Sequence, residues 1–240
     1  MTILTFITGG TGRLGSTLVD GFRRLGHKIV NIDLRRSENA DINILIDLTS
    51  DFDEKLVLKP FNGRTINQCN FIHAAGIVAD VGRKDWVTDL NMLGEHISKN
   101  AFYLSAIAPA KLIATIQDHC FVNAVFISSI YGTFAPYFDL YERSGNMQNP
   151  LGYGASKAAE VYSMSWLNAR YEKTVRINTI SPGGIESPSM TEDFKNKYRV
   201  RTRTGQFASE IKIMNVVEFL CSEASSQIVN ENIHVADGYR

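Results

Sequence analysis

Short apolar runs alternate with longer amphipathic stretches along the whole chain. The apolar runs are rich in β-branched and aromatic residues, as buried strands are, and fall at residues 3–7, 28–33, 42–46, 69–72, 123–127, 175–180 and 233–235. Apolar positions at helical spacing predict helices near 18–25, 51–59, 95–118, 158–164 and 209–221. This alternation predicts a single doubly wound Rossmann-type α/β domain over 1–240, with a parallel sheet of about seven strands and helices on both faces.

A glycine-rich turn joins the first predicted strand to the first predicted helix. It holds four glycines in the seven positions 9–15, more than a plain turn needs. Glycines in this context indicate dinucleotide binding, because they let the backbone approach a pyrophosphate at the N–H groups of a helix N-terminus. The expected cofactor contacts here are Gly9, Thr11, Gly12, Arg13, Leu14 and Gly15.

The cofactor type is predicted from the end of the second strand. Asp33 stands there, 18 residues after Gly15. A carboxylate in this place hydrogen-bonds the adenosine ribose hydroxyls and repels a 2′-phosphate, which favours NAD over NADP. NADP stays open, because Arg13, Arg35 and Arg36 are nearby cations that would receive such a phosphate.

Two further cofactor-binding segments are expected, at the ends of the third and fourth strands. Asp47 and Leu48 suit the adenine edge, although an ordinary strand-terminal aspartate explains Asp47 nearly as well. After the fourth strand come His73 and then three small residues against which a cofactor can lie, Ala74, Ala75 and Gly76. For His73 we favour a structural role beneath the cofactor over a catalytic one.

Tyr153 and Lys157 are four residues apart in a predicted helix, so their side chains point the same way. A phenol has an ordinary pKa near 10, and a neighbouring ammonium favours the phenolate, which makes the pair an acid/base. Taken alone, the pair also fits a solvated helix face. The motifs elsewhere in the chain favour the catalytic interpretation.

Three other places carry candidate chemistry. Ser128 and Ser129 follow the fifth strand at its carboxyl end, where ligands gather in open α/β sheets. Asn100 lies inside a predicted helix, where asparagine is a poor helix former, so it is either exposed or recruited to the site. The sixth strand ends in the turn Ser181-Pro182-Gly183-Gly184-Ile185.

Composition narrows the function classes. The 240 residues carry no net charge, with 44% apolar and 21% charged residues, which argues against nucleic acid or an anionic membrane as partner. No apolar run approaches a membrane span, and we expect no signal peptide, because residues 1–6 lead directly into the first strand. Cys69, Cys120 and Cys221 are far apart in sequence and have neither metal nor redox spacing. We expect buried thiols, no metal and a cytoplasmic protein.

Taken in order, these motifs resemble the short-chain dehydrogenase/reductase family nearly end to end, through to Asp237-Gly238. The resemblance implies that Tyr153 is the general acid/base and that Lys157 favours the phenolate and holds the nicotinamide ribose. It implies that Ser129 orients the substrate oxygen and that Asn100 holds a water of the proton relay. Ser129 matches better than Ser128, because it stands three before Gly132. The resemblance also places Pro182, Gly183 and Ile185 at the nicotinamide carboxamide and implies a homodimer or homotetramer.

Two features depart from the small dehydrogenases of this family. The glycines at 9, 12 and 15 and the 24-residue gap from Ser129 to Tyr153 are typical of its larger sugar-nucleotide branch, whose C-terminal domain we do not expect here. The insert 133–142, with Asn149-Pro150, resembles a subgroup of bacterial oxidoreductases associated with flagellin glycosylation and surface sugars.

A basic segment follows the sixth strand within 187–207, where the family has a substrate lid. Cations occupy every second position, at Lys195, Lys197, Arg199, Arg201 and Arg203. An extended backbone would turn all five to one side, whereas a helix would scatter them. If extended, they are expected to capture an anionic substrate. The alternatives are a solvated loop and pairing with acids of a neighbouring subunit.

The leading hypothesis is an NAD(H)-dependent oxidoreductase that interconverts a hydroxyl and a carbonyl on a small molecule, either sugar-derived or anionic. The first alternative is a sugar-nucleotide epimerase or dehydratase, in which the hydride returns to the same substrate. The second is a non-catalytic dinucleotide-binding regulator, against which the intact Ser, Tyr and Lys argue, since a sensor needs no acid/base pair.

Overall fold

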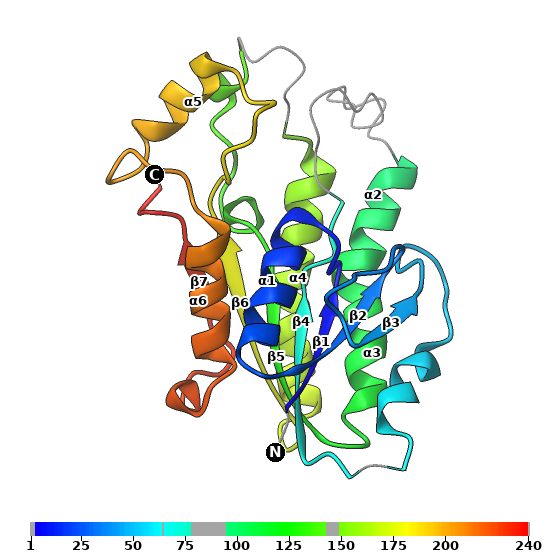
Figure 1. Ribbon diagram of the computed structural model, residues 1–240. Helices are drawn as coiled ribbons and strands as arrows, with labels where there is room; N and C mark the ends of the chain where they lie inside the picture. The colour runs from blue at the N-terminus through cyan, green and yellow to red at the C-terminus, as the bar shows by residue number, and fades with distance from the viewer. Residues whose placement is uncertain (1–2, 64, 78–94, 143–148, 240) are drawn as a thin grey trace.

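A single parallel sheet forms the centre of the molecule (Figure 1). The computed structural model describes residues 3–63, 65–77, 95–142 and 149–239. Within them, seven strands pair in the order β3-β2-β1-β4-β5-β6-β7, all parallel. Their bounds are β1 Leu4–Thr8, β2 Lys28–Asp33, β3 Ile42–Leu45, β4 Gln68–His73, β5 Phe121–Ile127, β6 Val175–Pro182 and β7 Asn232–Val235. The strand order reverses between β1 and β4, so the carboxyl ends of these strands flank a crevice suited to a ligand.

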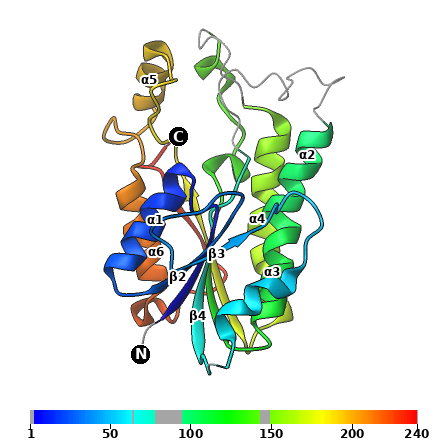
Figure 2. The same cartoon turned by 45° about the vertical axis from the view of Figure 1, so that its right-hand side comes forward.

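Helices cover both faces of the sheet, as predicted for a doubly wound domain (Figure 2). On one face lie α1 (Arg13–Arg24) and α6 (Glu210–Leu220), whose apolar stripes meet in one core cluster with β1 and β5. On the other face lie α2 (Glu95–Phe102), α3 (Ala108–Ile116) and α4 (Leu151–Arg170). The buried side chains of α3 and α4 form a second core cluster with the sheet.

The predicted helix over 95–118 exists but contains a π-helical turn, Tyr103–Ile107, between α2 and α3. Pro109 explains the interruption, because it has no N–H to give and its ring clashes with the carbonyl four residues earlier. A π turn absorbs that defect without ending the helix. The predicted helix at 51–59 is a 3₁₀ helix over Glu54–Phe61, capped by the Asp53 side chain.

The basic segment is helical over most of its cations, so the extended backbone that anion capture requires is not present. Thr191 caps a helix, α5 (Glu192–Arg199), whose buried Phe194 and Tyr198 lie one turn apart and anchor it to an aromatic cluster. Four of the basic side chains pair with acids of this same chain. These ion pairs are Lys195 with Glu186 and Glu192, Lys197 with Asp193, Arg199 with Glu186, and Arg201 with Asp139. The segment is therefore not a one-sided cationic stripe, and the argument for anion capture fails.

The cysteines are buried, as predicted, but two of them are not far apart in space. Cys69 in β4 and Cys120 at the start of β5 bring their sulfur atoms to 3.4 Å, because β4 and β5 are neighbours. Sequence spacing does not predict this proximity of the two thiols, because it depends on which strands are neighbours in the sheet.

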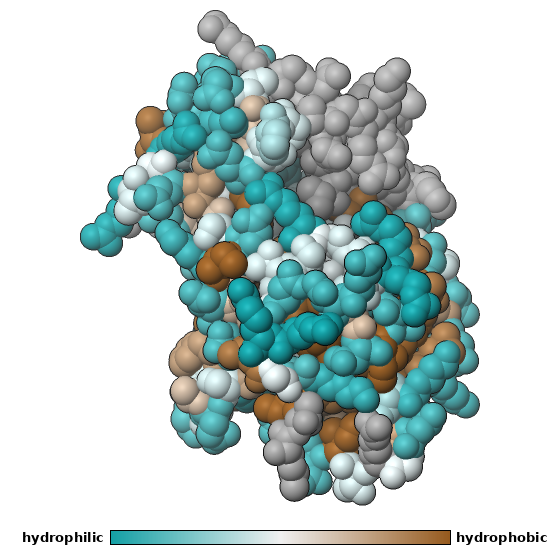
Figure 3. All heavy atoms as spheres, viewed as in Figure 1, coloured by the Kyte–Doolittle hydropathy of each residue, from teal (hydrophilic) through white to brown (hydrophobic). Residues whose placement is uncertain are grey.

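The outer surface fits the composition. In the view of Figure 3 it is mainly hydrophilic, and apolar residues are exposed only in small separate patches. No helix of the described chain is long and apolar enough to span a membrane. Among the described residues, no cluster of three or more His, Cys, Asp or Glu side chains is arranged to hold a metal.

Candidate active site

The glycine turn packs directly against the segment that follows β4. Gly9 has φ +69°, and a Cβ there would lie 2.6 Å from the Cα of Ala75. A Cβ at Gly15 would lie 2.0 Å from the Gly9 carbonyl oxygen. Gly12 begins α1 without a side-chain cap, which leaves the first N–H groups of the helix to a ligand. Only glycines fit this cradle, and it suits the pyrophosphate of a dinucleotide.

Asp33 is fixed to the glycine turn. Its Oδ2 accepts hydrogen bonds from the Thr11 N–H at 2.9 Å and the Thr11 hydroxyl at 2.8 Å. Its Oδ1 accepts from the Arg35 N–H at 3.1 Å. The carboxylate therefore sits beside the cradle with its orientation set by the chain, as the ribose prediction requires.

The predicted adenine contacts, Asp47 and Leu48, have structural tasks of their own. The Asp47 carboxylate accepts from the N–H and hydroxyl of Thr49, the pattern of an ordinary turn-forming aspartate. Leu48 is buried in the core. Contact of this segment with adenine stays a prediction.

The two candidate serines differ in what their hydroxyls do. Ser128 donates to the Lys157 carbonyl oxygen at 2.8 Å, so its hydroxyl is committed to α4. Ser129 accepts at 3.2 Å from the Tyr131 N–H, which leaves its own O–H to donate. The short helix after Ser129 packs so closely on α4 that a Cβ at Gly132 would lie 2.8 Å from the Lys157 carbonyl carbon. The serines and the first turns of α4 are thus brought together.

Lys157 lies deep in the molecule, only 6% exposed. Its Nζ donates to the Ile127 carbonyl oxygen at 2.9 Å and to the Glu160 Oε2 at 2.8 Å. Burial disfavours the ammonium, but Glu160 and Tyr153 outweigh that cost and raise the pKa of Lys157. Tyr153, half-buried on the same helix, is therefore within electrostatic reach of a permanent cation.

Asn100 lies in α2, which packs against α4, and it is half-buried. The π turn begins three residues after it, and such turns often occur at functional sites. The structure thus sets Asn100 on the helix beside the Tyr–Lys helix; the water it is expected to hold stays a prediction.

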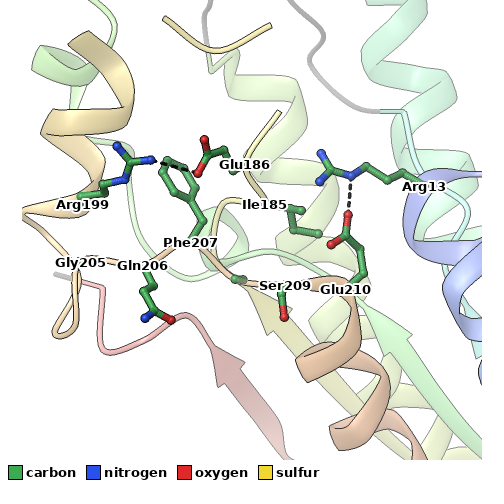
Figure 4. Close-up of a pocket in the computed structure, with 10 residues that line it drawn as sticks. Arg13, Ile185, Glu186, Arg199, Gly205, Gln206, Phe207, Ser209 and Glu210 are labelled. Atoms are coloured by element: carbon green, nitrogen blue, oxygen red, sulfur yellow. Dashed lines mark hydrogen bonds and ion pairs between the residues drawn. The ribbon is translucent and has the colours of Figure 1, made fainter. Parts of the chain in front are cut away.

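The turn after β6 forms one wall of a pocket of about 380 Å³ (Figure 4). Pro182 ends β6, and the Gly183 N–H is bonded to the Val235 carbonyl, which turns Ile185 toward Ala208. Two ion pairs flank the opening, Arg13 Nε with Glu210 at 2.5 Å and Arg199 with Glu186 at 3.1 Å. The lining residues are Arg13, Ile185, Glu186, Arg199, Gly205, Gln206, Phe207, Ala208, Ser209 and Glu210.

The pocket joins two predicted cofactor segments, the glycine turn through Arg13 and the turn after β6 through Ile185. It does not extend to α4, since none of its lining residues belongs to that helix. Sequence patterns do not predict the ion pair of Arg13 with Glu210, because this contact joins helices nearly two hundred residues apart.

His73 is buried beneath the site, as the structural interpretation predicts. Its Nδ1 is 2.8 Å from the Thr8 hydroxyl, and its ring packs edge-on to Phe126. Burial and the nearby Lys157 charge lower the pKa of His73 to about 3, against a small opposing effect of the Leu104 backbone. His73 is therefore neutral in the folded protein at ordinary pH and is no general acid.

Replacing His73 with Asn is expected to reduce the acid sensitivity of folding. The unfolded chain protonates this histidine below about pH 6.5 and the folded chain only near pH 3, so stability is full above 6.5 and falls as pH drops through that window. At about 1.4 kcal/mol per unit, the shift is worth several kcal/mol. Urea unfolding at a series of pH values measures the slope, with exposed His119→Asn as control. Equal slopes for His73→Asn and the unaltered protein would contradict this.

Comparisons with known proteins agree with the fold and with the glycine cradle described above. Residues 137–240 match a family model described as enoyl-(acyl carrier protein) reductase. The chain is 23% identical to post-translational flagellin modification protein A of Campylobacter coli, over 98% of this chain and 97% of the relative. It is 21% identical to dehydrogenase/reductase SDR family member 6 of Rattus norvegicus, over 99% and 96%.

Among solved structures, a short-chain dehydrogenase from Leptospira borgpetersenii with bound NAD⁺ superimposes with a TM-score of 0.73 and 24% identity, covering 99% of this chain and 92% of that one. Over nearly its whole length the chain is thus similar to short-chain dehydrogenases/reductases, and these similarities support an oxidoreductase.

Proposed function

We propose that this protein is an NAD(H)-dependent oxidoreductase that interconverts a hydroxyl and a carbonyl on a small molecule. One observation carries the proposal: a buried, charged Lys157 lies within reach of Tyr153 at the carboxyl edge of the sheet. The glycine cradle beside this edge fits the pyrophosphate of the cofactor. The Leptospira structure, which has the same fold, holds NAD⁺.

Each residue has a defined task in this proposal. The cofactor supplies or accepts the hydride. The glycine turn and the N-terminus of α1 bind its pyrophosphate, Asp33 its adenosine ribose, and the turn 182–185 its carboxamide. In the reducing direction, the Tyr153 hydroxyl gives its proton to the substrate oxygen while the Ser129 O–H donates a hydrogen bond to the same atom. Lys157 stabilises the resulting phenolate and holds the nicotinamide ribose. Asn100 holds the water that returns a proton.

The substrate we propose is sugar-derived. Support comes from the insert 133–142 and from the full-length likeness to a flagellin modification protein. The segment 187–207 is proposed as the lid, since Arg199 of α5 and residues 205–207 line the pocket. Capture of an anion by the lid is not part of the proposal, because most of its cations are paired within the chain.

A homodimer or homotetramer stays a prediction. Tyr162 and Trp166 lie one turn apart on α4 and are 71% and 51% exposed, so this helix offers an outward aromatic face to a second copy. The molecular mass in solution, measured by light scattering, tests this, and a strict monomer would contradict it.

The function is tested by incubating the purified protein and NADH with carbonyl compounds, starting with any small molecule that co-purifies. Net oxidation of NADH matched by alcohol formation supports the proposal. Conversion of a sugar nucleotide without net change in NADH identifies the epimerase or dehydratase alternative. Tight NADH binding with no turnover of any such compound favours the regulator.

Asp33→Asn is expected to narrow the preference for NADH over NADPH. The change keeps an oxygen that accepts from Thr11 but removes the charge that repels a 2′-phosphate, and Arg35 is then available to that phosphate. Fluorescence titration with both cofactors measures the ratio of Kd values, with Asp118→Asn, at an exposed position after α3, as the matched control. If the unaltered protein already binds NADPH more tightly than NADH, the assignment of Asp33 is wrong.

A further inference from the structure

Glu160 is a fully buried carboxylate three residues after Lys157 on α4. Its Oε2 is 2.8 Å from Lys157 Nζ. Its Oε1 faces His73 Nε2 at 3.9 Å, beyond hydrogen-bond distance, and neither of these two buried atoms has a hydrogen-bond partner within the described part of the chain. The catalytic scheme described above does not use this acid.

A buried carboxylate is costly unless a cation and hydrogen bonds compensate it. Further along the buried face of α4 lie the apolar residues Met164 and Leu167, which pack into the core without that cost. The cation nearest to Glu160 is Lys157. The Glu160 carboxylate is thus compensated by its ion pair with the lysine of the proposed site, whereas packing in the core gives no reason for an acid here.

The ammonium of Lys157 is held from two sides. Ile127 at the end of β5 accepts one N–H and Glu160 accepts another, which leaves the third donor of the ammonium to a cofactor ribose. A Cβ on Gly76 would lie 3.4 Å from Nζ, so the ammonium reaches the segment where the cofactor is expected to lie. The direction of that third N–H is set by the other two bonds.

His73, on β4, lies on the other side of Glu160 from Lys157. Thr8 bonds Nδ1, and with Thr8 as donor the ring proton is on Nε2, which lies 3.9 Å from Glu160 Oε1. Lys157 on one side and the His73 N–H on the other thus face the two oxygens of one carboxylate.

We propose that Glu160 is a positioning residue, held between Lys157 and His73, that aims the Lys157 ammonium at the nicotinamide half of the cofactor. The proposal rests on the proposed function and deepens it. The working unit is then Tyr153, Lys157 and Glu160, on one helix, with His73 of β4 as its support.

The test compares binding of NADH with binding of ADP, which carries the adenosine half but no nicotinamide ribose. Glu160→Gln is expected to weaken NADH binding about ten- to a hundredfold, the range of a lost charge-assisted hydrogen bond, and to leave ADP binding unchanged. The matched control is Glu172→Gln, on the exposed turn after α4. Equal losses for both ligands, or no loss for NADH, would overturn the proposal.

A second comparison separates positioning from a merely structural role. In a Lys157→Met background, Glu160→Leu is expected to cause no further loss of NADH affinity, because Glu160 acts through the lysine. Additive losses would overturn the proposal. Thermal melting checks folding, and Glu160→Gln carries the test if a Leu variant fails to fold. Failure of the unaltered protein to bind NADH would instead overturn the proposed function itself.

Discussion

Tyr153→Phe is expected to lower turnover at least about 10²- to 10⁴-fold, the usual contribution of a general acid/base. The substitution keeps the ring on α4 and removes the only proton that the side chain can transfer. Lys157 keeps its bonds to Ile127 and Glu160, so NADH affinity is expected to stay within about twofold. Single-turnover rates with saturating NADH measure the chemical step directly.

The control for this prediction is Tyr162→Phe, on the same helix but 71% exposed. It is expected to turn over like the unaltered protein. A Tyr153→Phe variant that retains its rate would remove Tyr153 from the mechanism and leave the substrate oxygen without its assigned proton donor.

Lys157→Met is expected to lose both turnover and NADH affinity, because the lysine has two tasks. It also leaves Glu160 buried without its cation, and breaking one side of a buried pair costs about 3–5 kcal/mol of stability. Stability is therefore measured alongside NADH titration and turnover, the first by urea unfolding.

Lys173→Met, at an exposed position after α4, is the matched control for Lys157→Met. It is expected to change none of the three quantities. If Lys157→Met binds NADH as tightly as the unaltered protein, the lysine does not hold the nicotinamide ribose, and the inference about Glu160 fails with it.

The parts of the site that the sequence predicted depend on local patterns. The glycines at 9, 12 and 15 allow close backbone approaches, of Gly9 to Ala75 and of Gly12 and Gly15 to the Gly9 carbonyl, and their spacing is visible in the chain. The seven strands were predicted because their apolar runs are short and bounded by polar or glycine residues, and each observed strand overlaps its predicted range.

The parts that were missed depend on long-range contacts or on which helix face is buried. In the sequence, Glu160 is an ordinary acid three residues after a lysine. Only the structure shows that it lies on the buried face of α4, opposite His73. The alternating cations at 195–203 suggested an extended segment instead of the helix α5. The sequence nevertheless contains three helix signals: the Thr191 cap, two acids in the first turn and the Phe194–Tyr198 spacing. In this segment the helix signals and the burial of the two aromatic side chains determine the backbone conformation. The alternation of cations has no structural effect, because it would place them on one side only in an extended chain.

Hydride transfer is the central claim, and isotope transfer measures it most directly. The protein is incubated with NADH carrying deuterium on the transferable position of the nicotinamide and with its carbonyl substrate, and the alcohol is examined by mass spectrometry. The account predicts one deuterium in each product molecule, one NAD⁺ formed per alcohol, and loss of both in Tyr153→Phe. Product formed without deuterium would contradict it.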